Sequence, residues 1–441
     1  MDLSPINWIK IKFRKLFSKN YILKVFTFNG FSSIIRVLSN FILVKVIATF
    51  LGPGGLAIFG QLGSLTSIVN ISATGGISNA IIKYTSENIG KYNILFRYWF
   101  GAFVISITLV LLNTLLLIVF SEEISNIIFN DKSLFWVIVV LGLSSFFFVF
   151  SNFIISVLNG FNKLIEIIYI NVINTVIVSI YCIFFTIIFG LEGALFALAS
   201  SQLIQFFLVI KYFKKKHFLI IRRYFRGINL SSLFKDYGAF SIMAIASAIF
   251  VPMTYLVIRN IIITKLSIND AGVYEGMLKL SNAYLGIIST TITFYYLPKF
   301  SSMNSYLLIN KEIRNLFKIL IPGIILFLLM FFISKNLIIR LVLSNEFLKI
   351  NDFIIWQLIG DVFRSMSFVF SILFISKKYV VKYIILEFMF GFIFVILSYF
   401  FINSKGLNSI SMAYMISCIV VFSMFLIFHL RNSKTTIFQL R

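Results

Sequence analysis

The sequence predicts an all-α polytopic membrane protein, on three observations. Apolar residues make up 60% of the 441 positions, and charged residues only 12%. Soluble domains contain about 45–50% apolar and about 25% charged residues, so a soluble fold could not bury this much apolar surface. The mean hydropathy of the chain is +1.00. Finally, apolar runs of about 20 residues recur, which is the length needed to cross a hydrocarbon layer of ~30 Å.

Twelve of these runs, separated by short polar breaks, are expected to be transmembrane helices. They are too long and too continuously apolar for barrel strands, which alternate over about ten residues. The runs lie near residues 22–49, 56–82, 98–120, 134–158, 164–189, 193–212, 237–262, 271–298, 315–334, 353–376, 380–402 and 407–430.

An internal repeat relates the two halves of the chain. The segment Phe-Val-Phe-Ser at 148–151 in the fourth run recurs at 368–371 in the tenth, and the second run resembles the eighth. Because helix n matches helix n+6 and six is even, both halves enter the membrane from the same side, as a parallel repeat. We predict a basic N-terminal segment, an N-lobe, a basic linker, a C-lobe and a tail, at 1–20, 21–212, 213–236, 237–430 and 431–441.

The charge balance predicts the orientation. The chain has 39 Lys and Arg against 15 Asp and Glu, a net charge of +24. With the N-terminus inside, the cytoplasmic segments hold 27 of these bases and the opposite side six. Cytoplasmic loops are enriched in Lys and Arg, so both termini are expected in the cytoplasm. Because most of the excess charge is a topology signal, we expect no nucleic-acid partner.

Six bases lie inside the predicted helices. Lys24 and Lys45 are near helix ends, where they are expected to extend to the interface. The other four are Arg36, Arg259, Lys279 and Arg364. A base deep in the bilayer costs at least about 2.5–3.5 kcal/mol, so such a residue normally faces a watery cavity or a partner.

Polar residues share helix faces with these bases. They are Asn29, Ser33, Arg36 and Asn40 on the first helix, Glu275, Lys279 and Asn282 on the eighth, and Gln357, Asp361, Arg364 and Ser371 on the tenth. Such faces either hydrogen-bond helices together or line a water-filled cavity. The bases on these faces favour the second interpretation, a water-filled cavity.

Two acid–base pairs have helical spacing. Glu275 and Lys279 are four residues apart, and Asp361 and Arg364 are three apart, so each pair can form on its own helix. One interpretation is that the acid and the base of each pair neutralise each other during insertion. The other is that the acids change protonation or partner during transport. Bases outnumber acids in the interior of the predicted helix bundle, which favours a large anion as the transported substrate.

No pattern for catalysis, a metal or a cofactor is found. His217 and His429 are far apart and lack ligand-spaced Cys or acid neighbours. No phosphate-binding or dinucleotide fingerprint occurs. Cys182 and Cys418 lie in apolar runs, which indicates packing rather than a disulfide. We therefore expect no catalytic residues, no metal and no cofactor.

Several segments resemble a known family. They are LGPGGL at 51–56, DAGVYEG at 270–276, SNAYL at 281–285, YLP at 296–298 and WQLIGDV at 356–362. With them the chain resembles, over its whole length, the Wzx polysaccharide flippases of the multidrug/oligosaccharidyl-lipid/polysaccharide exporter superfamily, especially the lipid III branch. The resemblance implies two six-helix lobes in a V around a central cationic cavity.

The resemblance also implies a substrate and a location. The substrate would be an undecaprenyl-diphosphate-linked oligosaccharide, either an O-antigen repeat unit for lipopolysaccharide or lipid III of enterobacterial common antigen. The protein would flip it from the cytoplasmic to the periplasmic leaflet of the bacterial inner membrane, with a glycan polymerase and a chain-length regulator as further partners.

The working hypothesis is flipping of this lipid by alternating access. The expected cavity residues are Arg36, Asn40, Arg259, Lys279, Asn282 and Arg364, with Glu275 and Asp361 as counter-ions that release the bases or carry protons. One alternative is a multidrug exporter of the same superfamily, which would favour cavity carboxylates for cationic drugs. Another is a membrane-embedded glycan polymerase or ligase, which would need a large outer loop with catalytic Arg or His.

Overall fold

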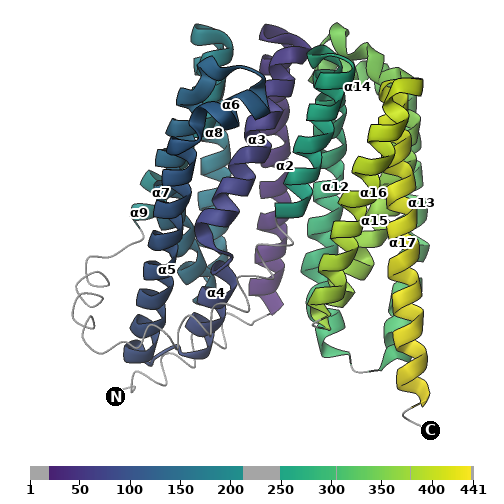
Figure 1. Cartoon of the computed structure of the whole chain (residues 1–441). Coiled ribbons are helices and arrows are strands. Elements are labelled where there is room, and N and C mark those ends of the chain that lie inside the picture. Colours follow the sequence, from purple (N-terminus) through teal and green to yellow (C-terminus); the bar gives the residue numbers. More distant parts are fainter. Residues whose placement is uncertain (1–18, 212–248, 304, 378, 439–441) are drawn as a thin grey trace.

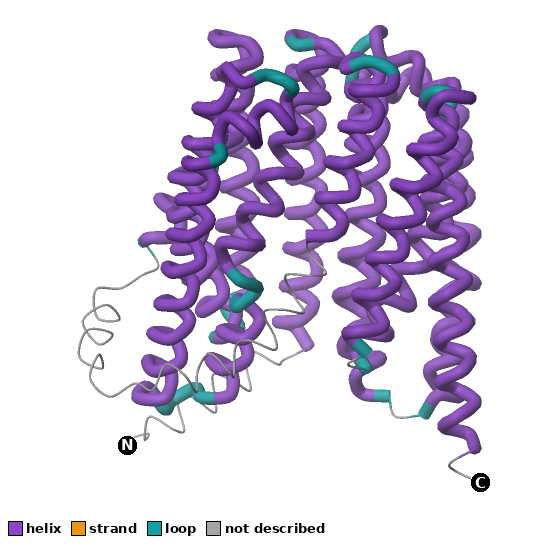
Figure 2. Tube along the Cα trace, viewed as in Figure 1, coloured by secondary structure: helices purple, strands orange, loops and turns teal. Residues whose placement is uncertain are grey.

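The computed structural model describes residues 19–211, 249–303, 305–377 and 379–438. Every regular element in these ranges is a helix, and no strand occurs among them (Figure 2). The prediction of an all-α membrane protein is confirmed. Most of the basic segment 1–20, the linker 213–236 with His217, and the end of the tail 431–441 lie outside the described residues.

The N-terminal half contains long apolar helices, three short α-helices and one 3-10 turn. They are α2 (Lys19–Phe50), α3 (Gly52–Thr74), α4 (Ser78–Glu87), α5 (Tyr92–Val119), α6 (Ser121–Phe129), the 3-10 turn η1 (Lys132–Leu134), α7 (Phe135–Gly160), α8 (Leu164–Ser200) and α9 (Gln202–Ile210).

The first described element of the C-terminal half is a helix that covers residues 249–265. It continues with α12 (Ile268–Ser302), α13 (Tyr306–Ile333), α14 (Lys335–Val342), the 3-10 segment η2 (Asn345–Asp352), α15 (Ile354–Ser376), α16 (Val380–Lys405) and α17 (Leu407–Phe438). The side chain of Ser267 accepts a hydrogen bond from the Asp270 backbone N–H at 3.0 Å and so sets the start of α12.

Nine helical segments among the described residues are long and apolar enough to cross a membrane. The predicted runs 164–189 and 193–212 count as one of them, broken at Gly190 with φ 61° and ψ −137°. The run 237–262 is described only from residue 249, and α12 carries several charges. The count of twelve and the V shape stay predictions.

The second predicted run, 56–82, is two helices. Gly75 and Gly76 have φ angles of 59° and 64°, so α3 ends at Thr74 and α4 starts anew at Ser78. Glycine adopts this left-handed conformation without a steric penalty, which explains why the helix ends at this pair.

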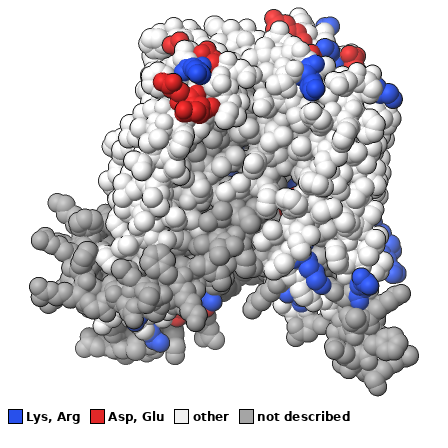
Figure 3. All heavy atoms as spheres, viewed as in Figure 1, with Lys and Arg blue, Asp and Glu red and all other residues white. Residues whose placement is uncertain are grey.

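Charged side chains gather at the two ends of the molecule. In Figure 3 a broad band of almost entirely uncharged surface separates them. The start of α2 and the end of α17 lie near the lower end (Figure 1). This distribution is what a chain crossing a hydrocarbon layer requires, because charge inside that layer is costly.

The two halves meet through α3 with α12, α2 with α12 and α14, and α3 with η2. Lys45 Nζ donates to the carbonyl oxygens of Arg340 and Leu343 at 2.6 and 2.5 Å. The ammonium group of Lys45 binds the carbonyls at the C-terminal end of α14, where a positive charge is favourable. The expected extension of Lys45 to the membrane interface stays a prediction. We call this region, which lies at the end of the molecule opposite the start of α2 and the end of α17, the closed end.

Glycine brings α3 and α12 together at the closed end. A Cβ atom at Gly272 would overlap the backbone carbonyl of Pro53, and one at Gly54 would lie 3.0 Å from Asn269 Oδ1. The helices therefore touch backbone to backbone, as small residues allow in membrane proteins.

Gly272→Ala is expected to lower the free energy of unfolding by about 1–3 kcal/mol, the usual cost of overpacking. The methyl group has no room unless α12 moves away from α3. Thermal unfolding of the purified protein measures this effect. Gly286→Ala on the same helix is the matched control, since a Cβ there meets nothing within 4 Å. Equal melting temperatures for the two variants would contradict the close approach.

Candidate functional site: a cationic cavity between the two halves

A cavity of about 610 Å³ lies between the N-terminal half and α12. Helices α2, α3 and α8 form one side and α12 the other. Its polar lining residues are Ser33, Arg36, Asn40, Asn174, Thr175, Ser179, Lys279, Asn282 and Thr290.

Two bases face this central cavity from opposite halves. Arg36 on α2 donates from Nη2 to Ser33 Oγ at 3.0 Å. Lys279 on α12 lies 3.0 Å from Glu275 Oε1, with 33% of its side chain exposed. No acidic residue lines the cavity among the described residues. The cavity is therefore cationic.

Amides and hydroxyls complete the lining. Asn40 and Asn282 are exposed and line the cavity from α2 and α12. Asn174, Thr175 and Ser179 line it from α8, and sequence reasoning missed them. A signal was present, because Thr175 and Ser179 are four residues apart, one helical turn, in an otherwise apolar run. Such groups can form hydrogen bonds with the hydroxyls of a polar ligand.

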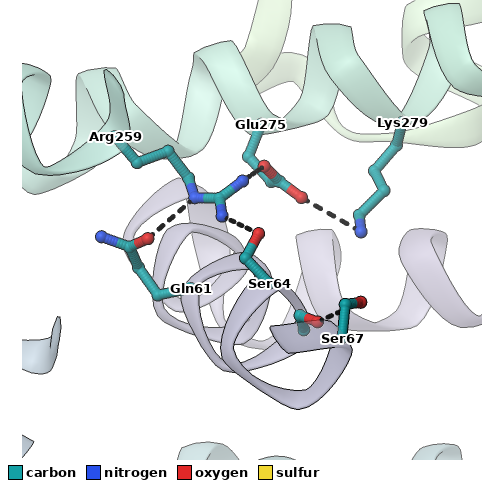
Figure 4. A network of polar contacts seen from close by, with 7 residues as sticks. Gln61, Ser64, Ser67, Arg259, Glu275 and Lys279 are labelled. Carbon is teal, nitrogen blue, oxygen red and sulfur yellow. Dashed lines mark hydrogen bonds and ion pairs between the residues drawn. The ribbon is translucent and has the colours of Figure 1, made fainter. Parts of the chain in front are cut away.

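Arg259 does not line this cavity. It lies next to it, with 2% exposure, in a network that joins the two halves (Figure 4). Its Nη1 lies 2.6 Å from Glu275 Oε2, its Nε donates to Gln61 Oε1 at 3.0 Å, and its Nη2 donates to Ser64 Oγ. Gln61 and Ser64 belong to α3, so a base of the C-terminal half is bound by the N-terminal half.

Glu275 is shared by two bases. One carboxylate oxygen binds Arg259 in the contact between the halves, and the other binds Lys279 at the cavity wall. Glu275 is 3% exposed, and a Cβ at Gly60 would lie only 2.6 Å from its Oε1. The pairing of Glu275 with Lys279 on one helix is confirmed. Its second pairing, with Arg259, could not be read from local spacing.

Asp361 and Arg364 do not form the expected pair. Asp361 is fully buried and accepts hydrogen bonds from Ser281 at 2.7 Å, Tyr414 at 2.8 Å, Gln357 at 3.4 Å and Tyr284. Three hydroxyls and one amide therefore take the place of Arg364 as partners of Asp361. Three of these donors come from α12 and α17, because α15 packs between those two helices.

Arg364 points instead toward α16. Its Nη2 lies 3.0 Å from Glu387 Oε2, and its guanidinium carbon lies 4.5 Å from the centre of the Phe390 ring. It lines a separate pocket of about 140 Å³ with Glu387 and Ser371. The neighbouring acid on α16 outcompetes Asp361 because Asp361 is already saturated with donors.

Four of the six predicted cavity residues therefore meet in one cavity, namely Arg36, Asn40, Lys279 and Asn282. Arg259 and Arg364 are buried in ion pairs outside its lining. The roles assigned to all six, and to Glu275 and Asp361, stay predictions. No group of three His, Cys, Asp or Glu side chains within the described ranges is placed to hold a metal ion.

Comparison with known families decides the family. Residues 22–304, well over half of the chain, match the family described as "Polysaccharide biosynthesis protein". The chain belongs to this family. The resemblance seen in the sequence motifs is thereby confirmed at the level of the family.

Individual relatives agree with this assignment. The chain is 24% identical to the lipid III flippase of Escherichia coli (strain K12) over 403 residues, which cover 89% of this chain and 94% of the relative. Among solved structures it resembles the lipid II flippase MurJ in an inward closed conformation, at 18% identity and a TM-score of 0.70, covering 93% of this chain and 87% of MurJ.

A multidrug resistance MATE family transporter of the MOP superfamily, in an inward-facing conformation, is similarly close in structure. Its TM-score is 0.70 at 16% identity, with 91% of this chain and 95% of that chain covered. These structural similarities establish the fold, a polytopic helical transporter fold.

Proposed function

We propose that this protein flips a polyprenyl-diphosphate-linked oligosaccharide across the bacterial inner membrane. The observation that carries the proposal is the central cavity itself, where Arg36 and Lys279 face an otherwise uncharged polar lining. Arg259, Lys279 and Glu275 sum to one positive charge, and Arg36 adds a second. A dianionic diphosphate matches this charge, and the amides and hydroxyls suit a glycan.

A side opening gives the lipid tail a path. A smaller cavity of about 240 Å³ between α2 and α12 shares Ser33, Ile287 and Thr290 with the central cavity. Its other lining residues include Ile34, which is 54% exposed. The polyprenyl chain can therefore remain in the bilayer between the halves while the head group occupies the cavity. This supports a lipid-linked substrate over a fully soluble one.

The orientation proposed from the Lys and Arg count places the termini in the cytoplasm. The closed end then faces the periplasm, and the cavity receives its substrate from the cytoplasmic leaflet. We propose that the N-lobe, residues 21–212, and the C-lobe, residues 237–430, rock against each other in alternating access. The lipid III flippase of E. coli, to which the chain is similar, supports this substrate class. A glycan polymerase and a chain-length regulator are proposed partners downstream.

Glu275 connects the cavity to the closed end. An anion bound to Lys279 competes with Glu275 for that base, because both interactions use the same ammonium group. Glu275 then binds Arg259 alone, and the balance of charge in the contact between the halves changes. Substrate arrival and opening of the closed end are coupled in this way, with no residue other than Glu275 needed between them.

The charge of the central cavity also argues against the alternative of a multidrug exporter. A multidrug exporter would favour carboxylates in the binding cavity, because they attract cationic drugs. The central cavity offers two bases and no acid among its described lining residues. We propose that the protein acts as a transporter and carries out no chemical reaction.

Deletion of the gene tests the function directly. The expected result is loss of surface polysaccharide and accumulation of lipid-linked repeat units on the cytoplasmic side. Normal surface polysaccharide in the deletion strain would reject a flippase role. Loss of polysaccharide without accumulated lipid-linked units would indicate an earlier step.

Asp361→Asn is expected to slow flipping, but by less than Arg364→Ala. Asparagine keeps an acceptor for Tyr414 and can donate to a rotated hydroxyl of Ser281. Removing Arg364 instead leaves the buried Glu387 carboxylate without its partner. Flipping of a fluorescent lipid-linked oligosaccharide in vesicles measures both variants.

The same assay separates two energy sources. An inside-negative potential favours outward movement of a dianion by about 2.3 kcal/mol per charge per 100 mV. A proton-coupled mechanism would respond to a pH gradient and lose that response in Asp361→Asn. Flipping that depends on voltage and ignores a pH gradient would leave Asp361 as a structural residue.

A further inference from the structure

A second large cavity lies in the C-terminal half, away from the transport site. It is a groove of about 660 Å³ formed by α13 and α17, with Phe370 of α15. On α13 its lining residues follow helical spacing along one face. The groove shares no lining residue with the central cavity.

Two bases stand at this groove. Arg314 and Lys318 are one helical turn apart on α13, both exposed, and neither forms an ion pair within the described residues. The nearest acid along the helix, Glu312, is 2.7 Å from Lys299 and does not line the groove. No acidic side chain lines it among the described residues, so its charge is uncompensated.

The depth of the bases follows from the length of the helix. At 1.5 Å per residue, the 28 residues of α13 span about 42 Å, which exceeds the ~30 Å of hydrocarbon. Every residue after Lys318 up to Ile333 is apolar. Arg314 and Lys318 therefore lie where head groups meet hydrocarbon. The walls beyond them, with Ile321, Pro322 and Leu426, are apolar.

A buried polar pair holds the two helices at the polar end of the groove. His429 on α17 is 4% exposed, and its Nε2 lies 2.6 Å from Asn310 Oδ1 on α13. The His429 ring also packs against Phe370, with 5.5 Å between ring centres. This contact links α13 to α17 beside the bases, so the groove is formed before any ligand arrives.

We propose that this groove binds an anionic phospholipid of the surrounding leaflet. The phosphate lies against Arg314 and Lys318, and one acyl chain follows Ile321, Pro322 and Leu426. Two uncompensated bases at head-group depth, above an apolar channel, match a negatively charged head with a hydrocarbon chain. The groove is separate from the central cavity, so the bound lipid is not the transported molecule.

Native mass spectrometry of the full-length protein in detergent tests the proposal. Phosphatidylglycerol and phosphatidylcholine with identical acyl chains are titrated separately. We expect phosphatidylglycerol to bind at least about tenfold more tightly, and Arg314→Ala/Lys318→Ala to remove about tenfold or more of that affinity. Arg314→Lys/Lys318→Arg keeps both charges and should retain binding.

The matched control is Lys91→Ala/Lys311→Ala, which removes the same charge from exposed bases that do not line the groove. It should leave the affinity unchanged. Equal losses in both double variants would indicate diffuse attraction and overturn the site. Equal binding of the two phospholipids would overturn it too. So would tighter binding of undecaprenyl phosphate than of phosphatidylglycerol at this groove, because the occupant would then be the substrate's own lipid.

Discussion

Replacing Arg36 and Lys279 together by alanine is expected to abolish surface glycan while the protein remains in the membrane. These are the two bases that line the central cavity, one from each half. A charge-assisted hydrogen bond contributes about 1.5–3 kcal/mol, so losing both should reduce flipping by at least about a hundredfold. Arg36 has no ion-pair partner among the described residues, so its removal leaves no buried charge uncompensated.

Flipping in vesicles and surface glycan in cells measure the loss, and the amount of protein in the membrane fraction shows that folding is intact. The control Lys132→Ala/Lys335→Ala removes two bases outside the cavity and should have no effect. Arg36→Lys/Lys279→Arg keeps the charge and should retain much of the activity. Full activity of the alanine double variant would reject the cationic cavity as the binding site.

Glu275→Leu is expected to destabilise the protein by about 3–5 kcal/mol, because it leaves the Arg259 guanidinium buried without a counter-ion. Arg259 is 2% exposed, and its remaining contacts, Gln61 and Ser64, are neutral. The melting temperature of the purified protein measures this effect. Glu123→Leu, at an exposed position of α6, is the matched control and should change the melting temperature little.

The double variant Arg259→Leu/Glu275→Leu separates charge from packing. It removes both ions of the buried pair and should be more stable than Glu275→Leu alone, since burying an ion pair costs desolvation energy. If both variants lose the same stability, the cost comes from packing at this position. If the Glu275→Leu variant is destabilised but still active, the network has only a structural role. That result would contradict the proposed role of Glu275 in coupling substrate binding to opening.

Much of the fold follows from the sequence alone. Apolar runs long enough to cross a bilayer specify helices, because every backbone polar group in hydrocarbon must be satisfied within its own segment. The pairing of Glu275 with Lys279 is local, so spacing was sufficient to predict it. The polar face of α2 likewise placed Arg36 and Asn40 on one side of a helix, and both line the central cavity.

The identity of the cavity residues was decided by tertiary structure. A base inside a membrane helix must find water or a partner, and the sequence does not show which partner is near. Arg259 meets Gln61 and Ser64 of a helix almost 200 positions away, and Arg364 meets Glu387 rather than Asp361. Asp361 is held by hydroxyls from two other helices. These pairings depend on which helix faces pack together. A periodic pattern in the sequence identifies the polar face of a helix, but it does not show which other helix packs against that face.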